Sequence, residues 1–401
     1  MLNQIKSLGP GLLYAGAAIG VSHLVQSTKA GAQYGYVLII AILLAHIFKY
    51  PFFALGPRYA NLTGESLVKG YAKMGKWAVF LLLILTVCTM FTVQAAVTIV
   101  TAGLVQKMTG TTLSAPVISL FLLSLCFLIL QVGKFSILDN LMKVIMIILS
   151  ISTVAAFVFS FGVDREVIPS AKAIFNITTN KDLSFLIAFV GWMPAPLDIA
   201  IWHSIWTLAK GKTTDSEFDF RIGFYGTAIL GICFLVLGAN TMYGSGISIE
   251  SSAGGFASQL IDAFTSSLGQ WSYWFILIAA FTTMFSTTLT CYDAIPRVMT
   301  HIGLELSFPI KSNTNSLWRI ILGLGSLVIL FFFVKNMRQM VTFATSISFL
   351  TAPALAFLSY RLVYKHHNKS NLWSKAEKWI ALVGIVILLT LGLLHLMSLA
   401  K

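Results

Sequence analysis

The sequence predicts an all-α membrane protein with eleven transmembrane helices, and three observations support this prediction. The 401 residues are 57% hydrophobic and only 10% charged, whereas soluble domains carry about 25% charged residues. Apolar runs of the roughly 20 residues that cross a bilayer recur along the whole chain. Basic residues gather in the loops between these runs. A soluble fold could not bury this much apolar surface in one core.

The expected spans are separated by short loops, and each boundary is set where an apolar run ends. Residues 253–266 have the pattern of a short amphipathic helix that precedes the eighth span. We expect residues 1–401 to form a single membrane domain, because no sizeable soluble segment interrupts the spans. The spans cover about residues 9–33, 35–57, 77–106, 112–132, 137–163, 184–209, 221–245, 270–296, 316–334, 338–363 and 378–398.

Lys and Arg are distributed unevenly between the two sets of alternate loops. One side carries 17 of these residues and the other carries 8. The positive-inside rule therefore places the N-terminus in the cytoplasm and the C-terminus outside the cell, in a multi-pass protein of the plasma membrane. The same loop clustering accounts for the net charge of +13 without a nucleic-acid partner.

Catalytic chemistry is not indicated by the polar residues. The four cysteines lie inside apolar runs, and their spacing fits neither a zinc site nor a disulfide framework. No nucleophile–base pair or metal-ligand cluster emerges from the sequence pattern. We therefore expect neither an enzyme nor a bound cofactor, apart from a coupling Na⁺.

Two of the expected spans are interrupted near their middle. The first contains Gly20-Val21-Ser22-His23, and the sixth contains Met193-Pro194-Ala195-Pro196-Leu197-Asp198. Proline removes a backbone donor, and unwound backbone at membrane depth persists only where protein or a water-filled cavity satisfies it. Glycine and proline are also generally common in membrane helices, which is the plainer interpretation. Since the interrupted spans lie five apart, they predict a secondary transporter with inverted five-helix repeats at about 9–163 and 184–363, followed by an extra helix at about 378–398.

Several motifs resemble those of the Nramp (natural resistance-associated macrophage protein) divalent-metal transporters. The likeness is strongest over about residues 9–70, visible at 190–210 and diffuse elsewhere. It implies a leucine-transporter-like fold with helices 1 and 6 broken, and transport by alternating access. The motifs are Gly9-Pro10-Gly11-Leu12-Leu13, Ala30-Gly31-Ala32-Gln33-Tyr34-Gly35-Tyr36, Thr63-Gly64-Glu65-Ser66-Leu67, and Met193-Pro194 with His203-Ser204.

The metal-binding motif of that family is absent. Where the family carries Asp-Pro-Gly-Asn, this chain carries Gly20-Val21-Ser22-His23. The Met-Pro-His element of the sixth helix becomes Met193-Pro194-Ala195, and Pro196-Leu197-Asp198 offers a second alignment. The third span, which carries proton-transferring acids in the family, contains no Asp or Glu. The chain thus resembles a divergent member that has lost the family's carboxylate ligands.

The residues found instead favour an anionic substrate. His23 and Lys29 are potential cations near a half-helix N-terminus, whose dipole attracts negative charge. A small oxyanion such as bicarbonate, driven by Na⁺ or H⁺, suits such a site. On plainer interpretations, Lys29 extends to the headgroups and His23 bonds a neighbouring carbonyl. The predicted substrate-binding residues are Gly20, Ser22, His23, Lys29, Met193, Ala195, Pro196, Asp198 and Trp202.

The resemblance also suggests a Na⁺ site beside the eighth span. Its ligands would be the hydroxyls of Ser286, Thr287 or Thr288 with the carbonyls of Ala18 and Val21. Hydroxyl groups in membrane helices also simply bond the preceding turn. Asp198, the only acid at the sixth break, could bind Na⁺, carry a proton, or pair with His23 or Lys29.

Two other functions are considered beside anion transport. A divalent-metal transporter for Mn²⁺ or Mg²⁺ could use Met193 and His23 as neutral ligands in an altered site. A non-transporting sensor is disfavoured, because the chain has no sizeable soluble domain to pass on a signal. We expect a monomer in the lipid bilayer, with a small ion as substrate.

Overall fold

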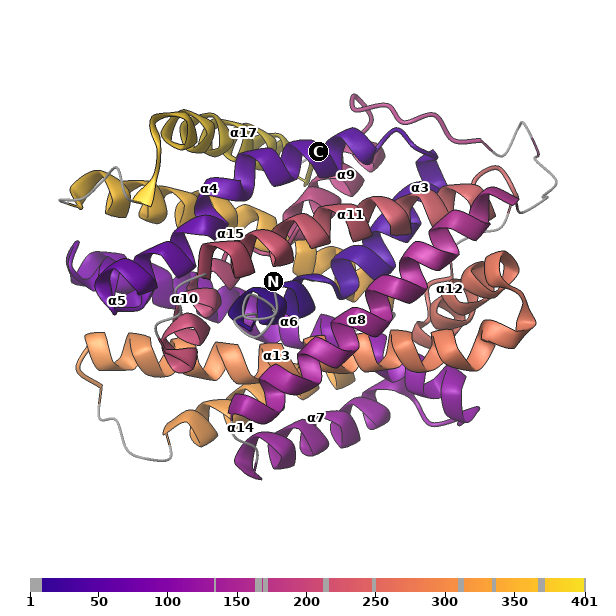
Figure 1. Cartoon of the computed structure of the whole chain (residues 1–401), viewed down its shortest axis with the longest axis horizontal. Coiled ribbons are helices and arrows are strands. Elements are labelled where there is room, and N and C mark those ends of the chain that lie inside the picture. Colours follow the sequence, from indigo (N-terminus) through magenta and orange to yellow (C-terminus); the bar gives the residue numbers. More distant parts are fainter. Residues whose placement is uncertain are drawn as a thin grey trace.

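The computed structural model is a bundle of long helices that run side by side (Figure 1). It describes residues 9–132, 135–162, 168, 172–211, 216–246, 250–308, 314–333, 337–366 and 372–399. Within these ranges all regular secondary structure is helical. The predicted all-α class is therefore confirmed.

Nine helices in the described ranges are long and apolar enough to cross a membrane. Each coincides with a predicted span to within several residues. The predicted amphipathic segment forms α12 (Ala253–Leu268), and a further short helix, α5, covers Leu67–Ala72. The nine are α4 (Ile39–Thr63), α6 (Lys76–Thr109), α7 (Ala115–Val132), α8 (Phe135–Phe159), α11 (Ser216–Met242), α13 (Tyr273–Glu305), α14 (Thr314–Val328, extended by a π-helix over Ile329–Phe333), α15 (Met337–Lys365) and α17 (Lys375–Leu399).

The first and sixth predicted spans are interrupted, as expected. The first consists of α2 (Pro10–Ala18), a π-helix over Val21–Ser27 and α3 (Thr28–Tyr34). The sixth consists of α9 (Asn180–Trp192) and α10 (Ile199–Lys210), joined by the non-helical residues 193–198. With the nine continuous helices, these two would give eleven spans, and that total stays a prediction.

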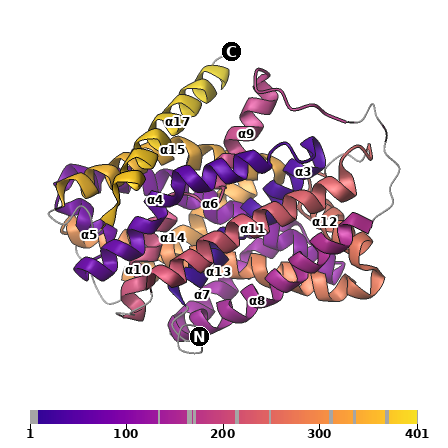
Figure 2. The ribbon, with the colours of Figure 1, turned by 45° about the horizontal axis from the view of Figure 1, so that its top comes forward.

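The helices of the two predicted repeats pack in matched pairs. Helix α2 packs against α11, and α10 packs against α4. Helix α8 contacts α2 and α13, while α15 contacts α9 and α6. Exchanging each span for the one five positions away converts each of these pairs into another of them. Figures 1 and 2 place α17 at the edge of this arrangement, away from α7 and α14.

Glycine allows the closest of these helix crossings. A β-carbon at Gly11 of α2 would overlap the backbone of Asp219 in α11, and one at Gly56 of α4 would overlap the carbonyl of Ala200 in α10. Small residues let membrane helices approach at the backbone, which strengthens their packing. The two crossings hold the interrupted spans against their neighbours.

The start of α2 is also anchored by a buried carboxylate. Asp219 accepts hydrogen bonds from the backbone N–H groups of Gly9 at 3.0 Å and Gly11 at 2.8 Å. These donors lie in the first turn, where a helix has unpaired N–H groups and the positive end of its dipole. Asp219 therefore fixes α2 to α11 at the end of α2 that lies away from the break.

Replacing Asp219 with alanine should destabilise the protein by about 1–3 kcal/mol, because two buried N–H groups lose a charged acceptor. The measurement is the thermal unfolding midpoint in detergent. Asp262→Ala is the control, because the contacts of the exposed Asp262 with Lys107, at 3.7 Å, and with the Ser258 hydroxyl, at 3.3 Å, are long. Equal midpoints for the two variants would show that the Asp219 carboxylate does not stabilise α2.

Candidate functional site

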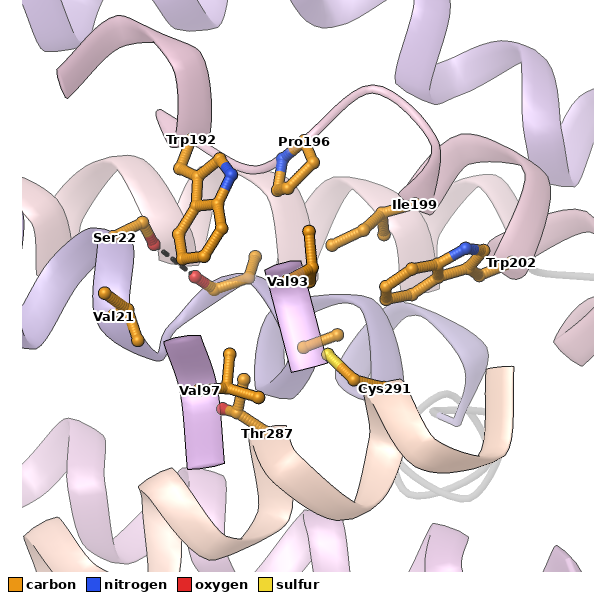
Figure 3. A pocket seen from close by; sticks show the side chains of 12 residues that line it. Val21, Ser22, Val93, Val97, Trp192, Pro196, Ile199, Trp202, Thr287 and Cys291 are labelled. Atoms are coloured by element: carbon orange, nitrogen blue, oxygen red, sulfur yellow. Dashed lines mark hydrogen bonds between the residues drawn. The ribbon is translucent and has the colours of Figure 1, made fainter. Parts of the chain in front are cut away.

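A small cavity lies where both interrupted spans meet α6 and α13 (Figure 3). Its volume is about 20 Å³, which is enough for about one water molecule. Figure 3 shows Trp192 and Pro196 on one side of this cavity and Thr287 on the other. The wall consists of Ala17, Ala18, Val21 and Ser22 from the first span, Val93 and Val97 from α6, Trp192, Pro196, Ile199 and Trp202 from the sixth, and Thr287 and Cys291 from α13.

The wall of this cavity contains no Asp, Glu, His or Lys side chain. Its side-chain hydroxyls belong to Ser22 and Thr287. Ser22 donates to the Ala18 carbonyl at 2.5 Å, and Thr287 donates to the Gly16 carbonyl at 2.9 Å (Figure 3 shows the first bond). Because α2 ends at Ala18, these hydroxyls bind carbonyls that the interrupted helix no longer pairs. The cavity therefore presents neutral oxygen atoms rather than formal charges.

Gly20 makes the contact between the first break and α13 possible. The chain leaves helical geometry here, with φ −131° and ψ −120° at Gly20. A β-carbon at this position would lie 2.7 Å from the Thr287 side chain. The glycine thus lets Thr287 approach the broken helix, although Gly20 is not part of the cavity wall.

His23 is fully buried and bonds toward α11 rather than forming part of the cavity wall. Its Nε2 lies 3.0 Å from the Thr227 carbonyl, and its Nδ1 lies 2.6 Å from Ser22 Oγ and 3.1 Å from the Ala18 carbonyl. A nitrogen that bonds a carbonyl must carry the proton. Both ring nitrogens lie near a carbonyl, and the Ser22 hydroxyl already donates its proton to Ala18. A neutral ring therefore donates from one nitrogen only, either from Nε2 to the Thr227 carbonyl or from Nδ1 toward the Ala18 carbonyl. In this conformation both ring nitrogens of His23 have partners within the protein, and its role in substrate binding stays a prediction.

Met193 and His23 both approach Gly231 of α11. A β-carbon at Gly231 of α11 would lie 3.5 Å from the Met193 sulfur and 3.6 Å from His23 Nε2. The imidazole and the thioether therefore both pack against α11 at Gly231. Neither Met193 nor the buried Ala195 belongs to the cavity wall.

Lys29 lies away from the cavity, on α3. Its ammonium lies 5.4 Å from the ring centroid of Phe185, a cation–π distance. Lys29 also lines a separate pocket of about 10 Å³ together with Gln26, Glu250 and Arg338. This pocket brings two cationic side chains and one carboxylate together beside α3.

Asp198 ends the sixth break and precedes the first turn of α10. Its backbone carbonyl accepts hydrogen bonds from the N–H groups of Ile201 and Trp202 at 2.9 and 3.3 Å. Its Oδ1 is buried and has no hydrogen-bond partner among the described residues. Within that same part of the chain Asp198 forms no ion pair with His23 or Lys29, so the expected charge pair is not made in this conformation.

Of the three hydroxyl residues expected to bind Na⁺, only Thr287 contacts the first span. Ser286 donates to the Thr283 carbonyl at 2.7 Å, within its own helix. Thr288 donates to the Met284 carbonyl at 2.9 Å and lies 2.8 Å from the Thr101 hydroxyl of α6. All three hydroxyls show the back-bonding that is usual in membrane helices, since the Thr287 hydroxyl also lies 3.1 Å from the Thr283 carbonyl.

Lys49 is a notable residue that the sequence analysis missed. It lies within α4 and is only 2% exposed. Its ammonium donates to the carbonyls of Val190 at 2.6 Å and Gly191 at 3.1 Å, at the end of α9. A lysine inside the predicted span 35–57 was the available signal, since charged residues within spans usually have functional partners.

The residue three positions before Lys49 was missed as well. His46 lies 3.2 Å from the Thr227 hydroxyl and 2.8 Å from the Ile42 carbonyl. Thr227 thus contacts two imidazoles, His23 through its carbonyl and His46 through its hydroxyl. Buried polar groups in a membrane need such partners.

Known proteins resemble this chain over nearly its full length. The family model described as "Natural resistance-associated macrophage protein-like" (Nramp) matches residues 11–400. The uncharacterized protein PM0681 of Pasteurella multocida (strain Pm70) is 34% identical over 406 residues, covering 98% of this chain and 92% of that protein.

Solved structures of transporters share the fold. The manganese transporter of Eremococcus coleocola, solved with an aromatic bis-isothiourea compound, superposes with a TM-score of 0.69 at 12% identity, over 97% of this chain and 85% of that one. MHP1, a nucleobase-cation-symport-1 family transporter, superposes with a TM-score of 0.60 at 13% identity, over 98% and 92%. At these identities the likeness concerns the fold alone. The match of the family model to almost the whole chain shows that this protein belongs to the Nramp family of membrane transporters.

Proposed function

We propose that this Nramp-family transporter carries a small anion, with bicarbonate as the leading candidate, and couples it to Na⁺ or H⁺. The observation that carries the proposal is the absence of an acidic side chain from the cavity wall between the two breaks. A divalent cation gives up part of its hydration shell on binding, and neutral hydroxyl and carbonyl groups compensate this poorly. An anion needs hydrogen-bond donors and positive potential instead.

Alternating access follows from the proposed pair of inverted repeats. The matched packing of α2 with α11 and of α10 with α4 supports a two-fold relation between the halves. The cavity has room for about one water molecule, which is less than a bicarbonate ion needs, so transport requires states in which it is wider. We propose eleven spans, a cytoplasmic N-terminus and an outer C-terminus, in keeping with the charge bias of the loops.

The pocket that contains Lys29 supports attraction of an anion from outside. Lys29 and Arg338 are its two cationic side chains, and the buried Gln26 adds an amide. A concave site with excess positive charge raises the local concentration of anions. Glu250 in the same pocket reduces this field, so the expected effect is moderate.

The contact between Thr287 and the end of α2 supports a Na⁺ site. Thr287 already reaches the Gly16 carbonyl, and the carbonyl of Ala18 is held by Ser22 nearby. Neutral hydroxyl and carbonyl oxygens suit a hard monovalent cation. Val21 contributes to the same cavity, so its carbonyl is a further candidate ligand.

A second candidate function is transport of a divalent metal such as Mn²⁺ or Mg²⁺. The juxtaposition of Met193 and His23 beside Gly231 favours it, and one solved structure of this fold is a manganese transporter. Both ring nitrogens of His23 are engaged, so metal binding would require the ring to turn. The described residues contain no group of three or more His, Cys, Asp or Glu side chains able to hold a metal.

Purified protein in proteoliposomes should take up labelled bicarbonate when a Na⁺ gradient points inward, because the cavity favours an anion. Uptake of bicarbonate should fall when neither a Na⁺ gradient nor a proton gradient is present. Mn²⁺ at micromolar concentration is the matched comparison. Mn²⁺ uptake without any bicarbonate flux would contradict the proposal and favour the second function.

Thr287→Ala should raise the Na⁺ concentration for half-maximal transport by about tenfold, the equivalent of about 1.4 kcal/mol. The variant removes the α13 hydroxyl that reaches α2. Ser286→Ala is the control, because its hydroxyl bonds only its own helix. A Na⁺ dependence that is equal in the two variants would exclude Thr287 from the coupling site.

Lys29→Gln should raise the KM for bicarbonate by about threefold to tenfold, since an attractive charge of about 1 kcal/mol is lost. Lys107→Gln tests a lysine on the same predicted side of the membrane that lies beside Asp262 and Tyr273. An unchanged KM in Lys29→Gln would mean that Lys29 only extends toward the headgroups.

A further inference from the structure

Lys49 caps the end of the half-helix that leads into the sixth break. Helix α9 ends at Trp192, and the two carbonyls that accept from Lys49 belong to Val190 and Gly191, just before that end. Among the described residues no carboxylate lies within 4 Å of this ammonium, so its partners there are carbonyl oxygens. A cation at a helix C-terminus is a favourable arrangement, because that end carries about half a negative charge.

Burying the charged form of Lys49 inside the membrane costs free energy, so its place beside the break suggests a function. A lysine near the middle of a membrane helix costs several kcal/mol, and such residues usually serve a functional purpose. The aliphatic part of Lys49 lines an apolar groove between α4, α9 and α17, where it can pack favourably. The Lys49 ammonium lies at the break. It bonds the carbonyl of Gly191, the residue before Trp192, and Trp192 forms part of the cavity wall.

The ammonium changes the electrostatic character of the break. Without it, the last carbonyls of α9 would turn their negative ends toward the interruption, as a site for a cation requires. On the other side of the break, Asp198 offsets the positive end of α10. Whatever the protonation state of Asp198, Lys49 in its protonated form makes the break more positive by one unit.

We infer that Lys49 determines the charge of the substrate by cancelling the negative end of α9. The inference rests on the proposed transport of a small anion through the adjacent cavity. Lys49 does not form part of the cavity wall and acts through the end of α9. It is therefore a specificity-determining residue rather than a direct ligand.

The test compares three variants in proteoliposomes with the wild type. Lys49→Arg keeps the charge, Lys49→Gln keeps a donor for the carbonyls without the charge, and Lys49→Met keeps only the length. Lys143→Met, in α8, is the control for neutralising another lysine within a span. Labelled bicarbonate and Mn²⁺ uptake are measured for each, and unfolding midpoints in detergent identify variants that fail to fold.

Bicarbonate uptake should fall by at least about tenfold in Lys49→Met and Lys49→Gln, while Lys49→Arg and Lys143→Met retain most of it. If Lys49 only held α9 in place through hydrogen bonds, Lys49→Gln would keep its activity. Wild-type uptake in a folded Lys49→Gln or Lys49→Met variant would overturn the inference. Should both fail to fold, loss of transport in a folded Lys49→Arg would overturn it, and retained transport would support it.

Failure of the proposed function gives a different result. If the wild type carries Mn²⁺ and no anion, the anion proposal is wrong, but Lys49 should still repel the cation. Lys49→Gln would then raise Mn²⁺ uptake several-fold, because the negative end of α9 is uncovered. Unchanged or reduced Mn²⁺ uptake in that variant would overturn the role of Lys49 in charge selection.

Discussion

The structure depends on satisfying the backbone groups that two interrupted helices expose inside the membrane. No bulk water is available there, so each freed carbonyl and N–H group needs a partner within the protein. The end of α2 is bonded by the Ser22 and Thr287 hydroxyls, and the end of α9 by the Lys49 ammonium. Each of these partners also helps to shape or charge the small cavity between the breaks. In the proposed mechanism, the contacts that satisfy the broken helices therefore lie at or next to the substrate site.

The spans and their interruptions could be predicted because they follow from composition. Apolar runs end at charged loops, and glycine and proline mark where a helix cannot continue. Six of the predicted site residues form part of the cavity wall, and the first break falls within two residues of the predicted motif. The six are Ala18, Val21, Ser22, Pro196, Trp202 and Thr287.

The direction of the remaining side chains could not be predicted. Residues Val21–Ser27 form a π-helix, whose wider turns rotate the following side chains relative to an α-helix. The π-helix turns His23 toward Thr227 and places Lys29 on another face of the span. No residue in the segment indicates a π-helix rather than an α-helix. Lys49 was missed because span boundaries were set from the hydropathy of the whole run, which a single lysine changes little.

The central claim is that the cavity between the breaks binds a small anion rather than a divalent metal. A ligand that binds only the folded state raises its unfolding temperature, and the rise grows with the logarithm of ligand concentration above the Kd. The most direct measurement is therefore the unfolding midpoint of the purified protein in detergent with Na⁺, with bicarbonate or with Mn²⁺ added at matched ionic strength. We expect bicarbonate to raise the midpoint and Mn²⁺ to leave it unchanged. A rise with micromolar Mn²⁺ and none with bicarbonate would contradict the claim.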